Sequence, residues 1–168
     1  MVLRGRIPRL IVFDCDHTLW PFGVDNFKFK PPYHKIDGQV FDSENKQMKC
    51  FPEVPQVLKI LNDNGFQLAA ASRTKYPEGV HSLIDLFGWD SYIKFREIYP
   101  GSKRKHFDNF KINSGIMYKQ MLFFDDETRN IDDIKPLGVM AVLVDREVGI
   151  TRQLIDKSLE EYSNISKY

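Results

Sequence analysis

Five short and almost continuously apolar runs alternate with helical patterns along this chain, and this alternation restricts the fold more than any other feature of the sequence. An apolar run without polar alternation is typical of a strand that is buried on both faces of a parallel sheet. The runs cover residues 10–13, 66–71, 92–95, 121–124 and 139–144.

Between these runs, apolar residues recur at the i, i+3, i+4, i+7 spacing of amphipathic helices. The spacing occurs at Val54, Val57, Leu58 and Leu61, and again at Val80, Leu83, Ile84 and Phe87. We expect two further helices over residues 128–137 and 151–162. The sequence therefore predicts an α/β fold in which a doubly wound, Rossmann-like parallel sheet carries helices on both faces.

Size and charge limit the classes of protein that fit. A chain of 168 residues, 42% of them hydrophobic, can bury one core, so we expect a single domain over residues 1–168. A net charge of +1 gives no electrostatic reason to expect binding to nucleic acid or to an anionic membrane. No apolar run approaches the roughly 18 residues of a membrane span. Two cysteines and no apolar leader before the first strand favour the cytoplasm.

Residues 20–51 form the longest segment outside the alternating pattern, and they are rich in proline, glycine and polar residues. Within the segment, the run from Ile36 to Val40 around Asp37-Gly38 predicts a β-hairpin turn. Long loops in compact folds are usually functional or disordered. We therefore predict a small hairpin flap, inserted after the first strand, that acts as a lid over a site.

The first apolar run ends abruptly in two carboxylates, Asp14 and Asp16. Residues two apart in an extended segment point to one face, so both side chains should converge on one site at the carboxyl end of the strand. Two carboxylates that lie together repel each other, and a divalent cation between them would remove this repulsion. Oxygen ligands without clusters of histidine or cysteine favour Mg²⁺. Cys15 alternates with both aspartates, and we interpret its thiol as buried.

Polar segments follow the other predicted strands in a recognisable order. Ser72-Arg73-Thr74 follows the second strand, Gly101-Ser102-Lys103 comes later, and Asp125-Asp126-Glu127 follows the fourth. With Asp14-x-Asp16-x-Thr18, these segments resemble the four motifs of the haloacid dehalogenase superfamily of phosphatases. Longer stretches, including Phe13 to Phe22 and Arg96 to Lys103, are similar to the eukaryotic magnesium-dependent phosphatase family. This resemblance implies a capless haloacid dehalogenase-like domain with a small flap.

The resemblance also implies an activity, which is magnesium-dependent hydrolysis of phosphomonoesters through an aspartyl-phosphate intermediate. Asp14 would be the nucleophile, and Asp16 would act as general acid and then general base. Mg²⁺ would be held by Asp14, by the backbone carbonyl of Asp16 and by Asp126. The choice of Asp126 over its neighbour Asp125 depends on the resemblance alone.

Other residues would surround the substrate. The set that we expect to bind it is Cys15, Ser72, Arg73 and Lys103, and the set that we expect to support the site is Thr18, Trp20 and Asp125. Some of these residues could instead have ordinary structural roles. Ser72 and Thr18 could each cap a turn or a helix, and an isolated lysine such as Lys103 is most often a solvated surface residue.

Two substrate classes agree with an open, capless site. One is a phosphorylated small molecule such as a sugar phosphate, and the other is a phosphoprotein that carries phosphotyrosine. The alternative from another functional class is a catalytically inert phosphate-binding or scaffold protein on the same fold. The sequence leaves the oligomeric state open, and a monomer is compatible with it.

Overall fold

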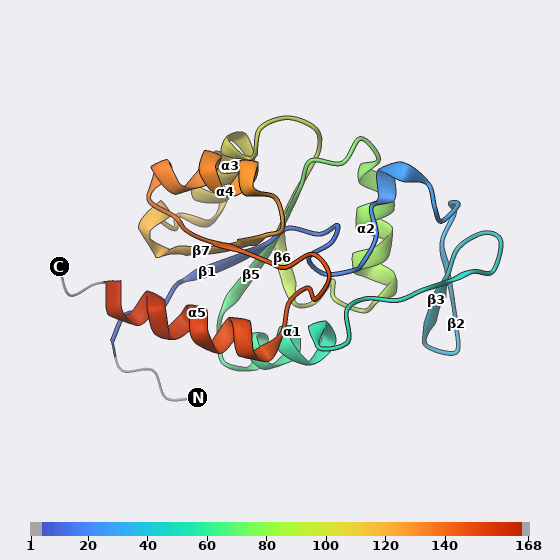
Figure 1. The fold of residues 1–168 in the computed structure, drawn as a ribbon, viewed down its shortest axis with the longest axis horizontal. Helices are drawn as coiled ribbons and strands as arrows, with labels where there is room; N and C mark the ends of the chain where they lie inside the picture. The colour runs from blue at the N-terminus through green and yellow to red at the C-terminus, as the bar shows by residue number, and fades with distance from the viewer. Residues whose placement is uncertain (1–4, 166–168) are drawn as a thin grey trace.

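The computed structural model describes residues 5–165, and parallel strands form its central sheet (Figure 1). The strands are β1 (Leu10–Phe13), β5 (Gln67–Ser72), β6 (Ile93–Ile98), β7 (Met121–Asp125) and β8 (Met140–Leu143). They pair in the order β6-β5-β1-β7-β8, with β1 at the centre and all pairs parallel. The predicted strands and the predicted parallel α/β fold are therefore confirmed.

Helices cover both faces of this sheet. One face packs against α1 (Val54–Asp63), α2 (Pro77–Leu86) and α5 (Arg152–Ile165), and the other packs against α3 (Lys103–Ser114) and α4 (Thr128–Ile134). Side chains of β1 alternate between the two cores, with Ile11 and Phe13 in one and Leu10 and Val12 in the other. This is the pattern expected of a central strand that is buried on both faces.

Two elements differ from the expectation. β6 continues to Ile98, past the predicted end at residue 95. The prediction ended too early because β6 is an edge strand, and its polar side chains Arg96 and Glu97 interrupt the apolar pattern. α3 was not among the helices that the spacing of apolar residues predicted. Its buried aromatic residues, Phe107 and Phe110, are too few to give a clear helical period.

The flap contains a small antiparallel sheet of β2 (His34–Ile36), β3 (Gln39–Phe41) and β4 (Gln47–Met48). Figure 1 shows β2 and β3 beyond α2, at one end of the molecule. Ile36 pairs with Gln39, and the two loop residues between them, Asp37 and Gly38, have φ values of 49° and 79°. Positive φ at both positions is the requirement of a type I′ turn, so the predicted hairpin is present.

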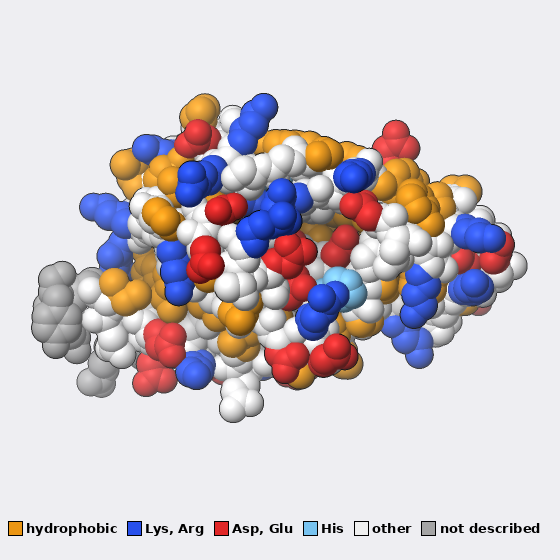
Figure 2. All heavy atoms as spheres, turned by 45° about the horizontal axis from the view of Figure 1, so that its top comes forward, with side chains coloured by type: hydrophobic (Ala, Val, Ile, Leu, Met, Phe, Trp, Pro, Cys, Tyr) orange, Lys and Arg blue, Asp and Glu red, His pale blue; other side chains and the backbone are white. Residues whose placement is uncertain are grey.

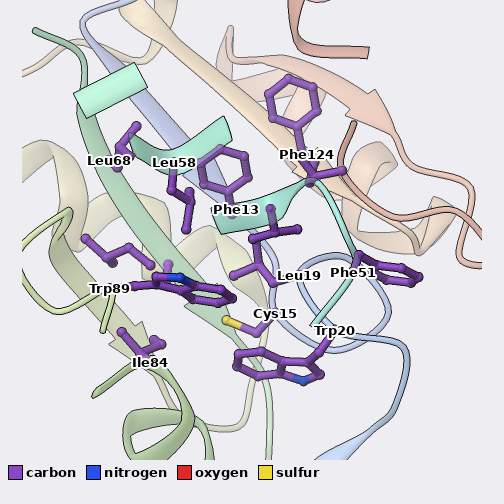
Figure 3. Close-up of a cluster of buried hydrophobic side chains, with 14 of the residues drawn as sticks. Phe13, Cys15, Leu19, Trp20, Phe51, Leu58, Leu68, Ile84, Trp89 and Phe124 are labelled. Carbon is purple, nitrogen blue, oxygen red and sulfur yellow. The ribbon is translucent and has the colours of Figure 1, made fainter. Parts of the chain in front are cut away.

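The turn that follows β1 is fixed by a buried aromatic cluster (Figure 3). Cys15, Leu19 and Trp20 are fully buried, and the Trp20 ring stacks on Trp89 at a centroid distance of 6.3 Å. Three side chains of the turn are thus held in the core. The polar residues between them are therefore held at the end of the sheet.

Residues 5–165 contain no helix that combines the length and the apolar character needed to cross a membrane.

Candidate active site

A cavity of about 530 Å³ opens at the carboxyl ends of the strands, beside the central strand β1. Its lining includes Asp14, Asp16, Ser72, Arg73, Lys103 and Asn130. The strand order reverses at β1, whose neighbours are β5 and β7, and such a switch point is where ligands bind in open α/β sheets. Figure 2 shows a hollow on this face, with acidic side chains visible in it and Lys and Arg side chains around it.

Asp14 is held at the end of β1 by its backbone and by both carboxylate oxygens. Its N–H donates to the Phe124 carbonyl at 2.9 Å, which fixes the residue beside β7. Lys103 Nζ donates to Asp14 Oδ1 at 2.7 Å, and the Thr18 hydroxyl donates to Asp14 Oδ2 at 3.0 Å. The Asp14 carboxylate therefore has one fixed orientation toward the cavity.

Lys103 is a fully buried lysine at the first position of α3, so it is not the solvated surface residue of the simplest interpretation. Its Nζ also donates to Asp125 Oδ2 at 2.7 Å. Burial alone would lower the pKa of Lys103, but the charges of Asp14 and Asp125 outweigh burial and raise it. The lysine is thus a permanent positive charge between two carboxylates.

The adjacent acids Asp125 and Asp126 have different surroundings. Asp125 Oδ2 accepts from Lys103 and, at 3.0 Å, from Asn130 Nδ2, while Asp125 Oδ1 accepts from the Glu127 N–H at 2.9 Å. Asp126 Oδ1 accepts only a long hydrogen bond, 3.5 Å from the Thr18 hydroxyl, within residues 5–165. Asp125 is therefore occupied with holding the lysine, whereas the Asp126 carboxylate is available to a ligand.

The three acids form a group that can hold a metal ion. Asp14, Asp125 and Asp126 each place a carboxylate oxygen within 4.8 Å of the other two. Asp125 is fully buried and accepts three hydrogen bonds, whereas Asp14 lines the cavity and Asp126 is only partly buried. Asp14 and Asp126 are therefore the residues that can offer oxygen atoms to an ion in the cavity. An all-oxygen set of this kind, open to solvent on one side, fits Mg²⁺, which takes one or two protein carboxylates and keeps several waters.

Proton affinities in this group reflect the crowding of negative charge. Burial raises the pKa of Asp14 to about 6; Lys103 opposes this shift, and Asp126 adds to it. Burial and the charge of Asp14 raise the pKa of Asp125 to about 6 as well. The site thus contains more buried negative charge than Lys103 balances, so a cation would be bound favourably.

Asp16 is positioned by the beginning of the flap. Its Oδ1 accepts a 2.8 Å hydrogen bond from Trp20 Nε1, and its Oδ2 accepts from the Val24 N–H at 3.3 Å. Burial raises its pKa to about 7; the Trp20 bond lowers it, and the charge of Asp14 raises it. A carboxyl group with a pKa near neutrality can both give and take a proton under physiological conditions.

From residues 20–51, the ones that line the cavity are Gly23, Asp25 and Asn26, around the short 3-10 helix η1 (Val24–Asn26). The Asp25 carboxylate accepts from the Lys75 N–H at 3.2 Å and from the Thr74 hydroxyl. The part of the flap nearest the site is therefore the η1 turn, which is tied to the loop after β5, rather than the hairpin.

Ser72 and Arg73 reach the cavity from the end of β5. Ser72 does not cap the next helix, because α2 begins at Pro77 and Tyr76 precedes it; the Ser72 hydroxyl accepts instead from the Thr74 N–H at 3.2 Å. Arg73 Nη1 donates to Asn130 Oδ1 at 3.2 Å. Both side chains therefore present hydrogen-bond donors to the same cavity as Asp14.

The Cys15 thiol lies in the core and not in the cavity lining, as its alternation with the aspartates predicts. Burial raises the pKa of this thiol well above its ordinary value, so it is unreactive. The expected contact between Cys15 and the substrate stays a prediction.

Sequence reasoning did not identify the role of His106. The ring is buried, and its Nε2 lies 3.0 Å from both the Ser72 and the Tyr99 carbonyl oxygens. His106 thus joins α3, which carries Lys103, to the ends of β5 and β6. The one available signal was its position one helical turn after Lys103.

Comparisons with known proteins show which family this chain resembles. Residues 6–165 match the model of a family described as Acid Phosphatase. The chain is 46% identical to human Magnesium-dependent phosphatase 1 over 160 residues, which are 95% of this chain and 89% of the human protein.

Solved structures share the fold. A HAD-superfamily hydrolase from Ehrlichia chaffeensis superimposes with a TM-score of 0.65 at 15% identity, covering 92% of this chain and 96% of that one. A phosphatase domain from Bacteroides fragilis, solved in complex with Mg, gives a TM-score of 0.65 at 14% identity and covers 92% of this chain and 40% of that one.

Proposed function

This chain belongs to the acid phosphatase family and is a phosphatase of the haloacid dehalogenase-like fold, and we propose that it hydrolyses phosphomonoesters at Asp14 in a magnesium-dependent reaction. One observation carries the proposal. Asp14, Asp125 and Asp126 bring oxygen atoms within 4.8 Å of one another, while Lys103 contacts the first two at 2.7 Å. A permanent cation and an open oxygen cluster beside a fixed carboxylate are what attack on an anionic phosphate requires.

Mg²⁺ would be held by Asp14, Asp126 and the backbone carbonyl of Asp16, and when bound it would offset the charge of the carboxylates and of the phosphate. Lys103, whose Nζ lies 2.7 Å from Asp14 Oδ1, offsets part of this charge. The Ser72 hydroxyl and the Arg73 guanidinium line the same cavity and would donate to phosphate oxygens.

The reaction proceeds in two steps at the chain's own carboxylates. In the first, a carboxylate oxygen of Asp14 forms a bond to phosphorus, the ester P–O bond breaks, and Asp16 donates a proton to the leaving oxygen. In the second, Asp16 takes a proton from water as that water attacks the aspartyl phosphate, which releases phosphate and regenerates Asp14. The pKa of Asp16, raised to about 7 mainly by burial, suits both proton transfers.

The experiment is an assay of p-nitrophenyl phosphate hydrolysis by the purified protein, with saturating Mg²⁺ or with EDTA. We expect turnover with Mg²⁺ and none with EDTA, and we expect Asp14→Asn to abolish turnover. Asp132→Asn, which changes an exposed acid on α4, is the matched control and should retain activity. Full activity of Asp14→Asn would reject the mechanism. Phosphate binding without turnover of any phosphomonoester would support an inert phosphate-binding protein.

For the substrate, we propose a phosphomonoester that reaches the cavity without passing a separate cap domain. The resemblance names sugar phosphates and protein phosphotyrosine, and a cavity of about 530 Å³ has the size of a small-molecule site. A panel of sugar phosphates, nucleotides and phosphotyrosine peptides, compared by kcat/KM, decides between them.

We also propose a cytoplasmic location, since Cys15 and Cys50 are free thiols.

A further inference from the structure

Asn130 connects two parts of the site that the sequence places far apart. It lies in the first turn of α4, and it is buried with an exposed fraction of 3%. Its amide donates from Nδ2 to Asp125 Oδ2 at 3.0 Å and accepts at Oδ1 from Arg73 Nη1 at 3.2 Å. An amide is suited to this place because it offers a donor and an acceptor on one short side chain.

On the side of Asp125, Asn130 belongs to a continuous chain of contacts that ends at Asp14. Asp125 Oδ2 accepts from both Asn130 and Lys103, and Lys103 also donates to Asp14 Oδ1 at 2.7 Å. The Asn130 amide therefore helps to fix the carboxylate that holds the lysine against Asp14.

On the other side, Asn130 holds Arg73 at the cavity. Among residues 5–165, the Arg73 side chain makes one hydrogen bond, to Asn130, and its buried Nε has no acceptor. A buried guanidinium N–H without an acceptor is costly and would be satisfied by an anionic oxygen entering the cavity. Without Asn130, nothing else in the described part of the chain would fix the direction of this guanidinium.

We propose that Asn130 is a positioning residue that orients Arg73 toward the substrate phosphate and couples it to the Asp125–Lys103–Asp14 chain. The inference depends on the proposed phosphatase function. It predicts that the two contacts of Asn130 have separable effects, with the Arg73 contact acting on KM and the Asp125 contact acting on kcat.

The test is a set of variants assayed with p-nitrophenyl phosphate at saturating Mg²⁺. Asn130→Ala removes both contacts and should raise KM and lower kcat, each by roughly tenfold, since hydrogen bonds to charged groups have about this effect. Asn130→Asp keeps an acceptor for Arg73 but turns the donor facing Asp125 into an oxygen, so kcat should fall while KM stays near the wild-type value. Asn113→Ala, an exposed asparagine on α3, is the matched control.

A double-mutant cycle with Arg73→Ala gives the decisive readout, because a purely structural role of Asn130 would raise KM in any background. We expect Asn130→Ala to raise KM in the wild type and to leave it unchanged when Arg73 is already alanine. An equal rise of KM in both backgrounds would overturn the inference. A thermal melt shows whether Asn130→Asp folds. If it does not, the double-mutant cycle still tests the inference, because it uses only Asn130→Ala and Arg73→Ala. Absence of turnover by the wild-type protein would reject the proposed function instead, and this outcome is seen before any variant is compared.

Discussion

The indole Nε1 of Trp20 donates a 2.8 Å hydrogen bond to Oδ1 of Asp16. The same indole ring is fully buried in the aromatic cluster below the site, where it stacks on Trp89 (Figure 3). The orientation of the proposed general acid is therefore set by a side chain of the hydrophobic core, and this relationship gives the first prediction.

Trp20→Phe should preserve most of the aromatic packing but remove the hydrogen bond to Asp16. We expect kcat to fall by roughly ten- to a hundredfold, because a hydrogen bond to a charged group contributes about 1.5 to 3 kcal/mol. The bond lowers the pKa of Asp16, so the pH optimum should move upward when it is lost. Trp89→Phe, in the same stack, is the control that leaves Asp16 untouched. An unchanged pH–rate profile in Trp20→Phe would contradict this role.

Removing the charge of Lys103 should affect stability as well as activity. Lys103→Met leaves Asp14 and Asp125 buried without their shared cation, and breaking a buried ion pair on one side typically costs about 3 to 5 kcal/mol. Urea unfolding measures the loss, and activity should disappear. Lys105→Met changes an exposed lysine on the same helix and should leave both quantities near wild type. Equal stability of the two variants would mean that Lys103 does not balance these carboxylates.

Gly149 should tolerate no side chain, because the loop after β8 packs closely on the flap segment. A Cβ at Gly149 would lie 2.1 Å from the Phe51 ring, and the residue has a φ of 71°. Gly115 has a similar φ of 73° but no atom within 4 Å of its ideal Cβ, so it provides a control for backbone strain alone. Gly149→Ala should destabilise the protein by about 1 to 3 kcal/mol more than Gly115→Ala does. Equal melting temperatures for the two variants would contradict this packing.

The metal-free protein should lose stability as the pH rises toward 7, because three carboxylates of the site bind protons more tightly in the folded state. Burial, as the largest cause, raises the folded-state pKa of Asp14 and of Asp125 to about 6 and that of Asp16 to about 7, well above the usual 3.8. These groups bind protons more tightly in the folded state, so their contribution is complete below about pH 4 and is lost as the pH rises through 6 to 7.

Thermal melts with EDTA and with Mg²⁺ between pH 5 and pH 8 measure this effect. Mg²⁺ binds the ionised carboxylates, so it should raise the melting temperature more at pH 7.5 than at pH 5. The opposite order, with the larger gain from Mg²⁺ at acid pH, would show that these carboxylates are not the metal ligands.

The fold could be predicted because its signals are local. The buried strands β1 and β7 carry continuous apolar runs over residues 10–13 and 121–124, and the hairpin carries the Asp37-Gly38 pair that its turn requires. Where the local signal is weak, the prediction failed, as it did for the end of β6 and for most of α3. Both elements are rich in polar residues, and long-range packing decides where they begin and end.

The candidate site, like the fold, could be predicted only in part. The motifs and the parallel sheet together predict that Asp14, Ser72, Lys103 and Asp126 lie near one another, since strand ends meet at one edge. The sequence could not distinguish Asp125 from Asp126, because the difference comes from Lys103 and Asn130, which lie on other elements. The connection made by His106 and the contact between Asn130 and Arg73 were missed for the same reason.

The central claim, that the phosphoryl group passes through a covalent bond to Asp14, is tested most directly by the stereochemistry of transfer. The measurement follows the configuration at phosphorus when a chiral, isotopically labelled phosphomonoester transfers its phosphoryl group to an alcohol acceptor in place of water. Two successive in-line displacements, first by Asp14 and then by the acceptor, predict net retention of configuration. Net inversion would show a single direct displacement and would contradict the account.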